Sequence, residues 1–293
     1  MTRAGIVAIA GRPNVGKSTF VNAAVGEKIA IVSDRPQTTR RAIRGVHEAD
    51  GAQVVFVDLP GVQRPRDALT ARMAGRVDQE LAGADAALLL VNAEQGVGAG
   101  DRFIARQLAQ RGLATTIAVN KVDRVAGARL VPVLSDAAAL VPGAEVFPVS
   151  ARRGSGMEAL LEHLRKEMPE GPFLFAPGSA GEQPLELVAA ELIREALIRR
   201  TYQEIPHASE VLVEEIERRA GGLCVVRALV WVESESQKAI VVGAQGRMIK
   251  AIGTAARHEL ERALEVRVHL DLSVRVRRDW RADDGLLDRL GIS

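Results

Sequence analysis

Residues 11–18 read Gly-Arg-Pro-Asn-Val-Gly-Lys-Ser and fit the pattern G-x-x-x-x-G-K-[ST] between an apolar run and a helical stretch. The two glycines let the backbone curl, so that its N–H groups point at a phosphate at the positive end of a helix. Lys17 can bridge the β- and γ-phosphates, and the Ser18 hydroxyl can bind Mg²⁺. The sequence therefore predicts a phosphate-binding loop with residues Gly11, Arg12, Pro13, Asn14, Val15, Gly16, Lys17, Ser18 and Thr19.

The chain around this loop alternates short apolar runs with amphipathic stretches, as strands and helices do when they alternate. Strands of continuous apolar character indicate a mainly parallel sheet with helices on both faces. The predicted fold is α/β, a P-loop domain over residues 1–168. We expect strands at 6–10, 53–58, 86–92, 115–120 and 145–149, helices at 17–25, 67–82, 101–111, 128–140 and 156–167, and an edge pair near 29–32 and 42–47.

A second motif, Asn120-Lys121-Val122-Asp123, follows a predicted strand and selects the base. The Asp123 carboxylate can accept two hydrogen bonds, from guanine N1–H and from the exocyclic amine. Adenine offers no such pair of donors and would leave the carboxylate unpaired. Asn120 and Lys121 can support the base, and the loop at Ser150-Ala151 can place a backbone N–H near guanine O6. The motif favours GTP and GDP as ligands.

The segment Asp58-Leu59-Pro60-Gly61-Val62 ends another predicted strand. Asp58 can hold Mg²⁺ through water, and the Gly61 N–H can meet the γ-phosphate. A threonine between the phosphate-binding loop and Asp58 would complete the metal shell. We expect this residue to be Thr39, with Thr38 as the alternative. The predicted metal ligands are Ser18, Thr39 and Asp58, and the predicted catalytic residues are Asn14, Lys17, Thr39, Asp58 and Gly61.

Residues 169–184 are rich in Pro and Gly and are expected to form a linker. Beyond them the order of elements changes to a compact α+β module over residues 185–293. We expect a long helix at 185–203, strands at 209–218, 223–233 and 238–242, a helix at 248–264, a strand at 266–276 and a small C-terminal helix.

The motifs together resemble those of the Era family of bacterial GTPases. The likeness lies in residues 11–19, 37–40, 120–123 and 150–151, and in Val241-Val242-Gly243-Ala244-Gln245-Gly246-Arg247-Met248-Ile249-Lys250-Ala251-Ile252-Gly253, which looks like a KH-type loop and helix. The tail Val274-Arg275-Val276-Arg277-Arg278-Asp279-Trp280 is similar as well. The resemblance implies a GTPase domain followed by a KH domain of type II. It further implies that the protein binds the 3′ end of 16S rRNA and acts in assembly of the small (30S) ribosomal subunit.

Charge supports an RNA-binding role for the second module. Residues 184–235 hold 6 basic and 10 acidic side chains, a net charge of −4, whereas residues 236–281 hold 10 basic and 5 acidic ones, a net charge of +5. The basic half contains the G-x-x-G turn, where RNA phosphates can approach the backbone. The expected RNA-binding residues are Gly243, Ala244, Gln245, Gly246, Arg247, Lys250, Arg275, Arg277 and Arg278.

The chain departs from the family pattern at two points. Leu59 replaces the usual Thr of Asp-Thr-Pro-Gly, and Ala244 and Gln245 replace the usual basic residue of the KH loop. Val62 stands where Ras carries the Gln that orients the attacking water, so unaided hydrolysis should be slow. Asn14 is the residue with which potassium-activated relatives help to bind a monovalent cation, so the resemblance implies K⁺ beside the phosphates. The alternative is that Asn14 is a turn residue that stabilises the loop.

No apolar run reaches the roughly 18 residues of a membrane span. We expect a cytoplasmic monomer, and the resemblance implies for some members a peripheral association with the inner membrane. Two other functions compete: a phosphotransferase built on the same loop, and a constitutive RNA-binding scaffold with little GTPase activity. A related GTPase that acts on another RNA is a further alternative.

Overall fold

The computed structural model describes residues 2–32, 39–61, 65, 67–181, 183–219 and 221–292. These residues form two compact units, one mainly of residues up to 182 and the other mainly of residues from 183 onward.

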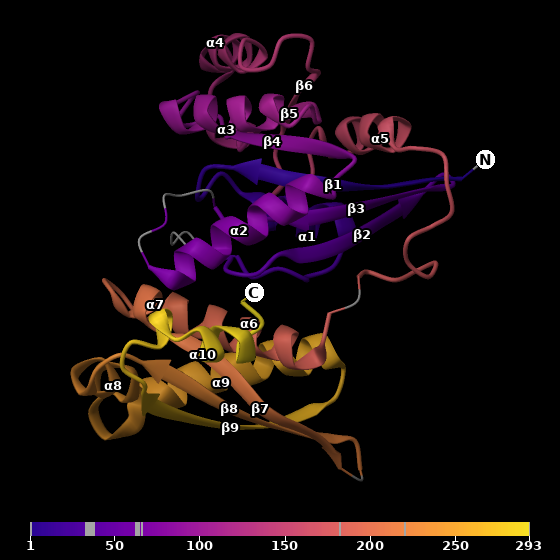
Figure 1. Cartoon of the computed structure of the whole chain (residues 1–293). Helices are drawn as coiled ribbons and strands as arrows, with labels where there is room; N and C mark the ends of the chain where they lie inside the picture. The colour runs from indigo at the N-terminus through magenta and orange to yellow at the C-terminus, as the bar shows by residue number, and fades with distance from the viewer. Residues whose placement is uncertain are drawn as a thin grey trace. The chain divides into compact units, whose positions relative to one another are not determined.

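The first unit is built on a six-stranded sheet in the order β2-β3-β1-β4-β5-β6 (Figure 1). β2 runs antiparallel to β3, and the other neighbouring pairs are parallel. The strands are β1 (Arg3–Gly11), β2 (Ile43–Ala49), β3 (Ala52–Asp58), β4 (Ala86–Asn92), β5 (Ala114–Asn120) and β6 (Val146–Val149). The helices are α1 (Lys17–Val25), α2 (Ala68–Ala82), α3 (Ala99–Gln110), α4 (Gly127–Ala138) and α5 (Met157–Glu167).

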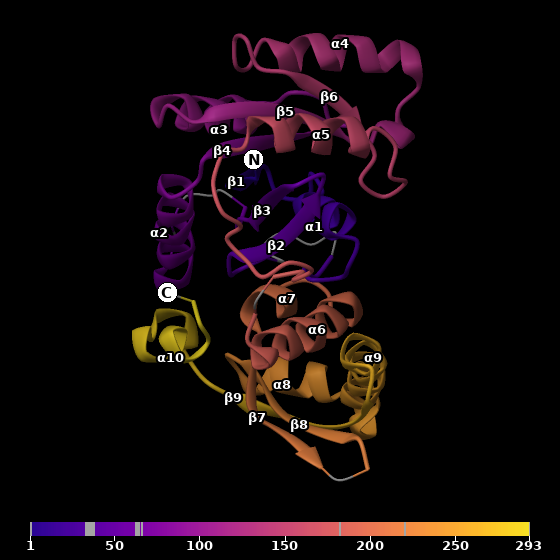
Figure 2. The same ribbon diagram turned by 90° about the vertical axis from the view of Figure 1, so that its right-hand side faces the viewer.

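Two apolar layers hold these helices on the sheet. Helices α1 and α5 lie on one face of the sheet, and α2, α3 and α4 lie on the other (Figure 2). Side chains of the first pair belong to one apolar cluster, and those of the other three helices belong to a second. Residues of β3 and β4 are buried on both faces, because successive side chains of a strand point to opposite sides. The predicted α/β fold with a mainly parallel sheet is confirmed.

One expected strand of this unit is wrong. Residues 29–32 form no strand, although 42–47 do lie largely in β2. The Asn22 side chain takes the place of a strand partner: its Oδ1 accepts the N–H groups of Ile29 and Ala30, and its Nδ2 donates to the Ala30 carbonyl.

The segment after α5, whose composition predicts a linker, lies along the first unit. The Ala4 N–H donates to the Pro169 carbonyl, and the Val46 N–H of β2 donates to the Ala180 carbonyl. The buried Gln53 side chain accepts the N–H groups of residues 174 and 175 and donates to the carbonyl of 175. Backbone groups of residues 169–181 are therefore hydrogen-bonded to β1, β2 and β3.

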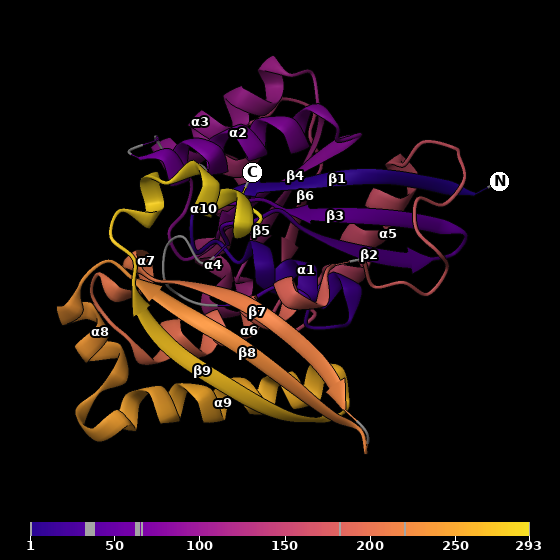
Figure 3. The same cartoon turned by 60° about the horizontal axis from the view of Figure 1, so that its bottom comes forward.

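The second unit is a three-stranded sheet, β7-β8-β9, with helices packed on it (Figure 3). β7 is antiparallel to β8, and β9 is parallel to β8. Its helices are α6 (Leu185–Arg200), α7 (Ile205–Ala208), α8 (Glu235–Val242), α9 (Arg247–Leu264) and α10 (Asp284–Arg289), and its strands are β7 (Glu210–Arg219), β8 (Leu223–Val232) and β9 (Arg267–Val276). The core includes residues of α6, α8, α9 and the strands, and the free Cys224 is buried in it.

The strand predicted at 238–242 is wrong, because these residues end α8. Ser234 caps that helix by accepting the Gln237 N–H, and the Gln237 side chain accepts the Glu233 N–H. These two hydrogen bonds at the N-terminus of α8 start a helix where the following apolar run alone indicates a strand.

Candidate functional site

The phosphate loop joins the end of β1 to the start of α1. Gly11 and Gly16 have φ angles of 155° and 102°, in the region that favours glycine. A Cβ on Gly16 would lie 2.5 Å from Asn120 Nδ2, and one on Gly11 would lie 2.7 Å from the Leu90 carbonyl oxygen. Both glycines are therefore required by close approach as well as by backbone conformation. The loop turns at the positive end of α1, where its N–H groups can meet phosphate oxygens.

Lys17, the first residue of α1, folds back over this loop. Its Nζ donates to the carbonyls of Gly11 and Arg12 at 3.3 and 3.4 Å. Burial lowers the pKa of Lys17, and the negative charge of Asp58 opposes that shift. A polyanionic ligand at the loop would supply the negative charge that favours the protonated form.

Three side-chain oxygens meet beside the loop. Ser18 Oγ donates to Asp58 Oδ2 at 2.6 Å and lies 3.1 Å from Thr39 Oγ1. Thr39 Oγ1 also donates to Asp58 Oδ2, at 3.3 Å. Hydroxyl and carboxylate oxygens are ligands that Mg²⁺ accepts, so the donor set fits this ion. The structure thus brings together the predicted metal ligands; the alternative Thr38 and its neighbour Gln37 lie outside the described residues.

The segment after β3, residues 59–61, lies beside the phosphate loop. Gly61 lies against the phosphate loop, because a Cβ on it would be 3.1 Å from Pro13 Cγ. Leu59 and Pro60 are buried. Leu59 belongs to the apolar layer under α2 and α3, which explains how an apolar residue fits there in place of the family's Thr. Val62 lies outside the described residues.

Asn120, at the end of β5, joins three loops. Its Nδ2 donates to the Val15 carbonyl at 2.9 Å, and its Oδ1 accepts the N–H groups of Lys121 and Ala151. Lys121 has a φ of 67°, and its Nζ donates to the Asn14 carbonyl at 2.7 Å. The predicted base-reading motif and the phosphate loop are thereby held together.

Asp123 lies in a short 3₁₀ turn, Val122–Arg124, after β5. Ser150 Oγ donates to Asp123 Oδ1 at 2.6 Å, and Arg153 lies 3.7 Å from Oδ2. The hydrogen bond from Ser150 lowers the pKa of Asp123, so the carboxylate is ionised at neutral pH. An ionised, positioned carboxylate can accept both N–H donors of a guanine edge.

Asp101 is a residue of the site that the sequence patterns do not predict. Its carboxylate is fully buried and lies 2.8 Å from Arg12 Nε, while it also accepts the Gly98 N–H at the start of α3. Arg12 donates in addition to the Gly96 carbonyl at 2.9 Å. No motif marks Asp101, because its partner is 89 positions earlier in the chain.

In the second unit, the G-x-x-G turn separates α8 from α9. Gly243, with a φ of 71°, has no room for a side chain, because a Cβ would lie 2.7 Å from Met248 Cβ. Gly246, with a φ of 74°, precedes the first residue of α9, Arg247. Ala244, Gln245, Arg247 and Lys250 are exposed. The turn therefore presents backbone N–H groups and two cations at the positive end of an 18-residue helix.

The three expected arginines of the tail, Arg275, Arg277 and Arg278, are exposed where β9 ends. The Arg277 N–H donates to the Val232 carbonyl at 2.7 Å, so this segment continues beside the end of β8. β8 runs through a short turn into α8, and α8 leads to the G-x-x-G turn. The G-x-x-G turn therefore follows α8, whereas the tail lies beside the end of β8, which precedes α8.

Comparison with known proteins covers both units. Residues 6–121 match a family model described as a 50S ribosome-binding GTPase, and residues 204–281 match a KH domain model. GTPase Era of Thermotoga maritima is 42% identical over 97% of this chain and 95% of its own length. GTPase Era of Mycobacterium tuberculosis H37Rv is 42% identical over 98% of both chains.

Solved structures are similar over the same length. A crystal structure of an Aquifex aeolicus Era variant bound to GDP and AlF4⁻ has a TM-score of 0.96 and 32% identity, with all of both chains covered. A structure of Era with MgGDPNP and nucleotides 1506–1542 of 16S ribosomal RNA has a TM-score of 0.95, with the same identity and coverage. Among the helices the structure describes, none is long and apolar enough to cross a membrane. The chain belongs to the GTPase Era family.

Proposed function

We propose that the protein is a GTP-hydrolysing switch that binds the 3′ end of 16S rRNA and acts in assembly of the small ribosomal subunit. The main support is that the phosphate loop, Asp58 and Asp123 lie at or just after the ends of β1, β3 and β5. Ser18 and Thr39 bond to Asp58 there. Parallel strands end at the same edge of a sheet, where such folds bind nucleotides. A G-x-x-G module on the same chain gives the switch an RNA to report to.

We place the guanine base beside the loops that Asn120 joins, those of residues 121–123 and 150–151. Asp123 accepts guanine N1–H and the exocyclic amine, and the hydrogen bond from Ser150 fixes the rotamer in which it does so. Lys121 packs over the base and sugar, and Val122 joins the apolar layer of α4. The Ala151 N–H, held by Asn120, lies in the loop that meets guanine O6.

Mg²⁺ at the oxygen cluster would neutralise charge on the β- and γ-phosphates. Ser18 would ligate it directly, Thr39 would do so when the γ-phosphate is present, and Asp58 would hold it through water. Lys17 and the Gly61 N–H bind the γ-phosphate and stabilise its charge as it develops. Loss of that phosphate releases Thr39 and Gly61, which makes the segments around them the switch.

Val62 cannot orient the attacking water, so catalysis must come from another source. A further positive charge beside the phosphates can supply it. We assign this role to K⁺ held with the help of Asn14, which has a left-handed φ of 64° and whose carbonyl accepts a hydrogen bond from Lys121. Turnover should rise about tenfold or more when K⁺ replaces Na⁺, because positive charge at the transition state is a major catalytic term. Equal turnover in the two buffers would contradict this role.

For RNA, the backbone of the G-x-x-G turn and the side chains of Arg247 and Lys250 would hold phosphates. Arg275, Arg277 and Arg278 extend the positive edge. The 16S target follows the complex of Era with a 16S fragment, since that relative matches the whole chain. The match to a 50S-binding GTPase model covers residues 6–121 and leaves the KH module out.

A GTP hydrolysis assay tests the enzymatic part. Lys17→Ala should lower kcat/KM by about 100-fold or more, by analogy with removal of a preorganised charge donor. Lys166→Ala is the matched control, because Lys166 is an exposed lysine on α5 whose Nζ pairs with Glu162. If Lys17→Ala hydrolyses GTP as fast as the unmodified protein, the measured activity does not come from this loop. The constitutive RNA-binding scaffold would then be favoured instead.

An RNA titration tests the second part. The double change Ala244→Asp and Gln245→Asp puts two negative charges into the turn and should weaken binding of a 16S 3′-end oligonucleotide about tenfold or more, since phosphate contacts dominate affinity. Arg218→Asp alters net charge by the same amount at the far end of β7 and should change binding less than threefold. Equal losses in both variants would mean that only net charge matters.

We also place the protein in the cytoplasm, with any contact to the inner membrane confined to its surface. The support is the family resemblance. Flotation with vesicles of anionic lipid checks this contact: recovery of the protein in the vesicle layer is the result expected of a peripheral protein, and its complete absence there contradicts the contact.

A further inference from the structure

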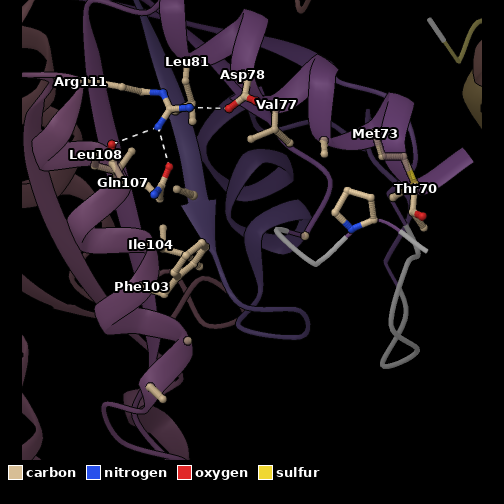
Figure 4. Close-up of a pocket in the computed structure, with 16 residues that line it drawn as sticks. Thr70, Met73, Val77, Asp78, Leu81, Phe103, Ile104, Gln107, Leu108 and Arg111 are labelled. Atoms are coloured by element: carbon tan, nitrogen blue, oxygen red, sulfur yellow. Dashed lines mark hydrogen bonds and ion pairs between the residues drawn. The ribbon is translucent and has the colours of Figure 1, made fainter. Parts of the chain in front are cut away.

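A cavity of about 530 Å³ lies in the first unit between α2 and α3 (Figure 4). Its volume is within the roughly 300–1,000 Å³ typical of sites for small molecules. Most of the side chains that line it are apolar, and the buried ones among them include residues of both helices: Met73, Val77 and Leu81 from α2, and Ile104 and Leu108 from α3. Phe103 lines it too, yet 52% of Phe103 is exposed. A ligand that covered this ring would remove apolar surface from water.

One end of the cavity is polar. The Arg111 guanidinium lies there, with Nη1 donating to the carbonyl and the Oε1 of Gln107 and Nη2 paired with Asp78 (Figure 4). The Asp78 side chain is 64% exposed, so water can solvate its carboxylate when it leaves Arg111. Gln107 would still hold the guanidinium in place. The cavity therefore offers a cation whose present partner is exchangeable for the acid group of a ligand.

We propose that this cavity binds an acidic amphiphile, a molecule with an apolar body of about two rings and one carboxylate or sulfonate group. The apolar body lies between α2 and α3 and covers Phe103. The acid group replaces Asp78 at Arg111. A guanidinium fixed at the end of an apolar cavity selects this class, because an acid group gains a charge-assisted hydrogen bond there and a neutral ligand does not.

The walls of the cavity are continuous with the proposed nucleotide site. Coupling between the cavity and nucleotide therefore rests on the proposed function. Ala10 lines the cavity and directly precedes the phosphate loop, and Gly61 lines it while lying against Pro13. Gly100 lines it as well, and a Cβ there would be 2.8 Å from Arg12 Cδ. A ligand that shifts these walls changes nucleotide affinity, and nucleotide must then change ligand affinity by the same factor.

Two dyes with one ring system test the site. 8-Anilinonaphthalene-1-sulfonate carries the acid group and N-phenyl-1-naphthylamine lacks it. In titrations of the full chain with saturating GDP, the sulfonate should bind at least fivefold more tightly than the neutral dye. Arg111→Gln should remove that difference, while Arg106→Gln, an exposed arginine of the same helix, should keep it. Equal binding of the two dyes by the unmodified protein, or an unchanged preference in Arg111→Gln, would overturn the role of Arg111.

A second pair of variants locates the apolar part. Ala74→Phe fills the cavity from α2 and should weaken both dyes at least tenfold. Ala71→Phe adds the same bulk on the exposed side of that helix and should leave binding unchanged. Thermal unfolding of each variant reports whether it is folded, and the Arg111→Gln result stands if Ala74→Phe is not. If a folded Ala74→Phe protein binds both dyes as tightly as the unmodified protein, the dyes bind elsewhere and the proposal is contradicted.

Coupling is measured on the same samples. Affinity for the sulfonate dye should differ at least threefold between the GDP-bound and the GDPNP-bound protein, and equal affinities would contradict the coupling. A parallel titration with fluorescent GDP keeps the two proposals apart. If the protein binds no GDP, the proposed function fails; if it binds GDP and the dye tests fail, the cavity proposal fails alone.

Discussion

The Arg12 guanidinium lies 2.8 Å from the Asp101 carboxylate, and this pair joins the phosphate loop to the first turn of α3. Asp101→Asn should lower the free energy of unfolding by about 2 kcal/mol, because it leaves Arg12 without its countercharge. The loss should be smaller than the roughly 3–5 kcal/mol of a fully buried pair, since 25% of the Arg12 side chain is exposed. Denaturant unfolding measures it, with Asp136→Asn on the exposed side of α4 as control. Equal stability of the two variants would mean that the pair is structurally neutral.

Asp123→Asn should exchange guanine for xanthine. The amide cannot accept both guanine donors, so GDP affinity should fall by about 100-fold, the equivalent of one or two hydrogen bonds to a charged group. Xanthine carries a carbonyl in place of the amine, and the amide N–H can donate to it. Titration with fluorescent GDP and xanthosine diphosphate checks both changes. Retained GDP affinity would remove Asp123 from the base site.

Leu59→Thr restores the family's usual residue and should nevertheless destabilise this protein. Leu59 is 1% exposed in the apolar layer under α2 and α3. The change removes buried methyl groups and buries a hydroxyl, at a cost of about 2–4 kcal/mol. GTP turnover below the unfolding transition should stay within twofold. Thermal unfolding measures the effect, with the half-exposed Leu174→Thr as control; a stability equal to that of the control would contradict the packing account.

His47 should make stability depend on pH. Burial and the positive charge of Arg165 lower the pKa of His47, although the Ala24 carbonyl opposes the shift by accepting a hydrogen bond. The carboxylates of Glu158 and Asp50 oppose it as well. The unfolded chain therefore binds a proton at about pH 6.5 and below, where the folded protein still does not.

The free energy of unfolding should consequently decrease as pH falls from about 6.5 toward the lowered pKa of the folded state. His47→Asn should flatten this part of the profile. The exposed His258→Asn should leave it unchanged, and urea unfolding at a series of pH values compares the two. Identical slopes in the original protein and His47→Asn would show that other groups govern the acid side.

Local sequence patterns were sufficient to predict most of the strands and helices of the first unit. Strands rich in apolar residues on both faces, helical periodicity and the glycine loop each follow from spacing within a few residues. The chemistry of the loop predicts its place as well: the Ser18 hydroxyl and the Asp58 carboxylate do meet, although they are 40 positions apart. Parallel strands bring such residues together at one edge of the sheet.

The features that the sequence did not reveal depend on contacts between distant residues or on side chains that act on the backbone. Asn22 binds the backbone of residues 29 and 30, which prevents a strand there. Ser234 and Gln237 cap α8, where an apolar run by itself favours a strand. The pairing of Asp101 with Arg12 and the cavity between α2 and α3 exist only in the folded chain.

Crosslinking to RNA shows whether the nucleotide-bound protein recognises 16S rRNA. Purified protein with GDPNP is crosslinked to total cellular RNA, and the bound RNA is sequenced. We expect enrichment of the 3′ end of 16S rRNA, reduced in Ala244→Asp with Gln245→Asp and retained in Arg218→Asp. Enrichment of transfer RNA over 16S rRNA, or the same profile in all three proteins, would contradict it.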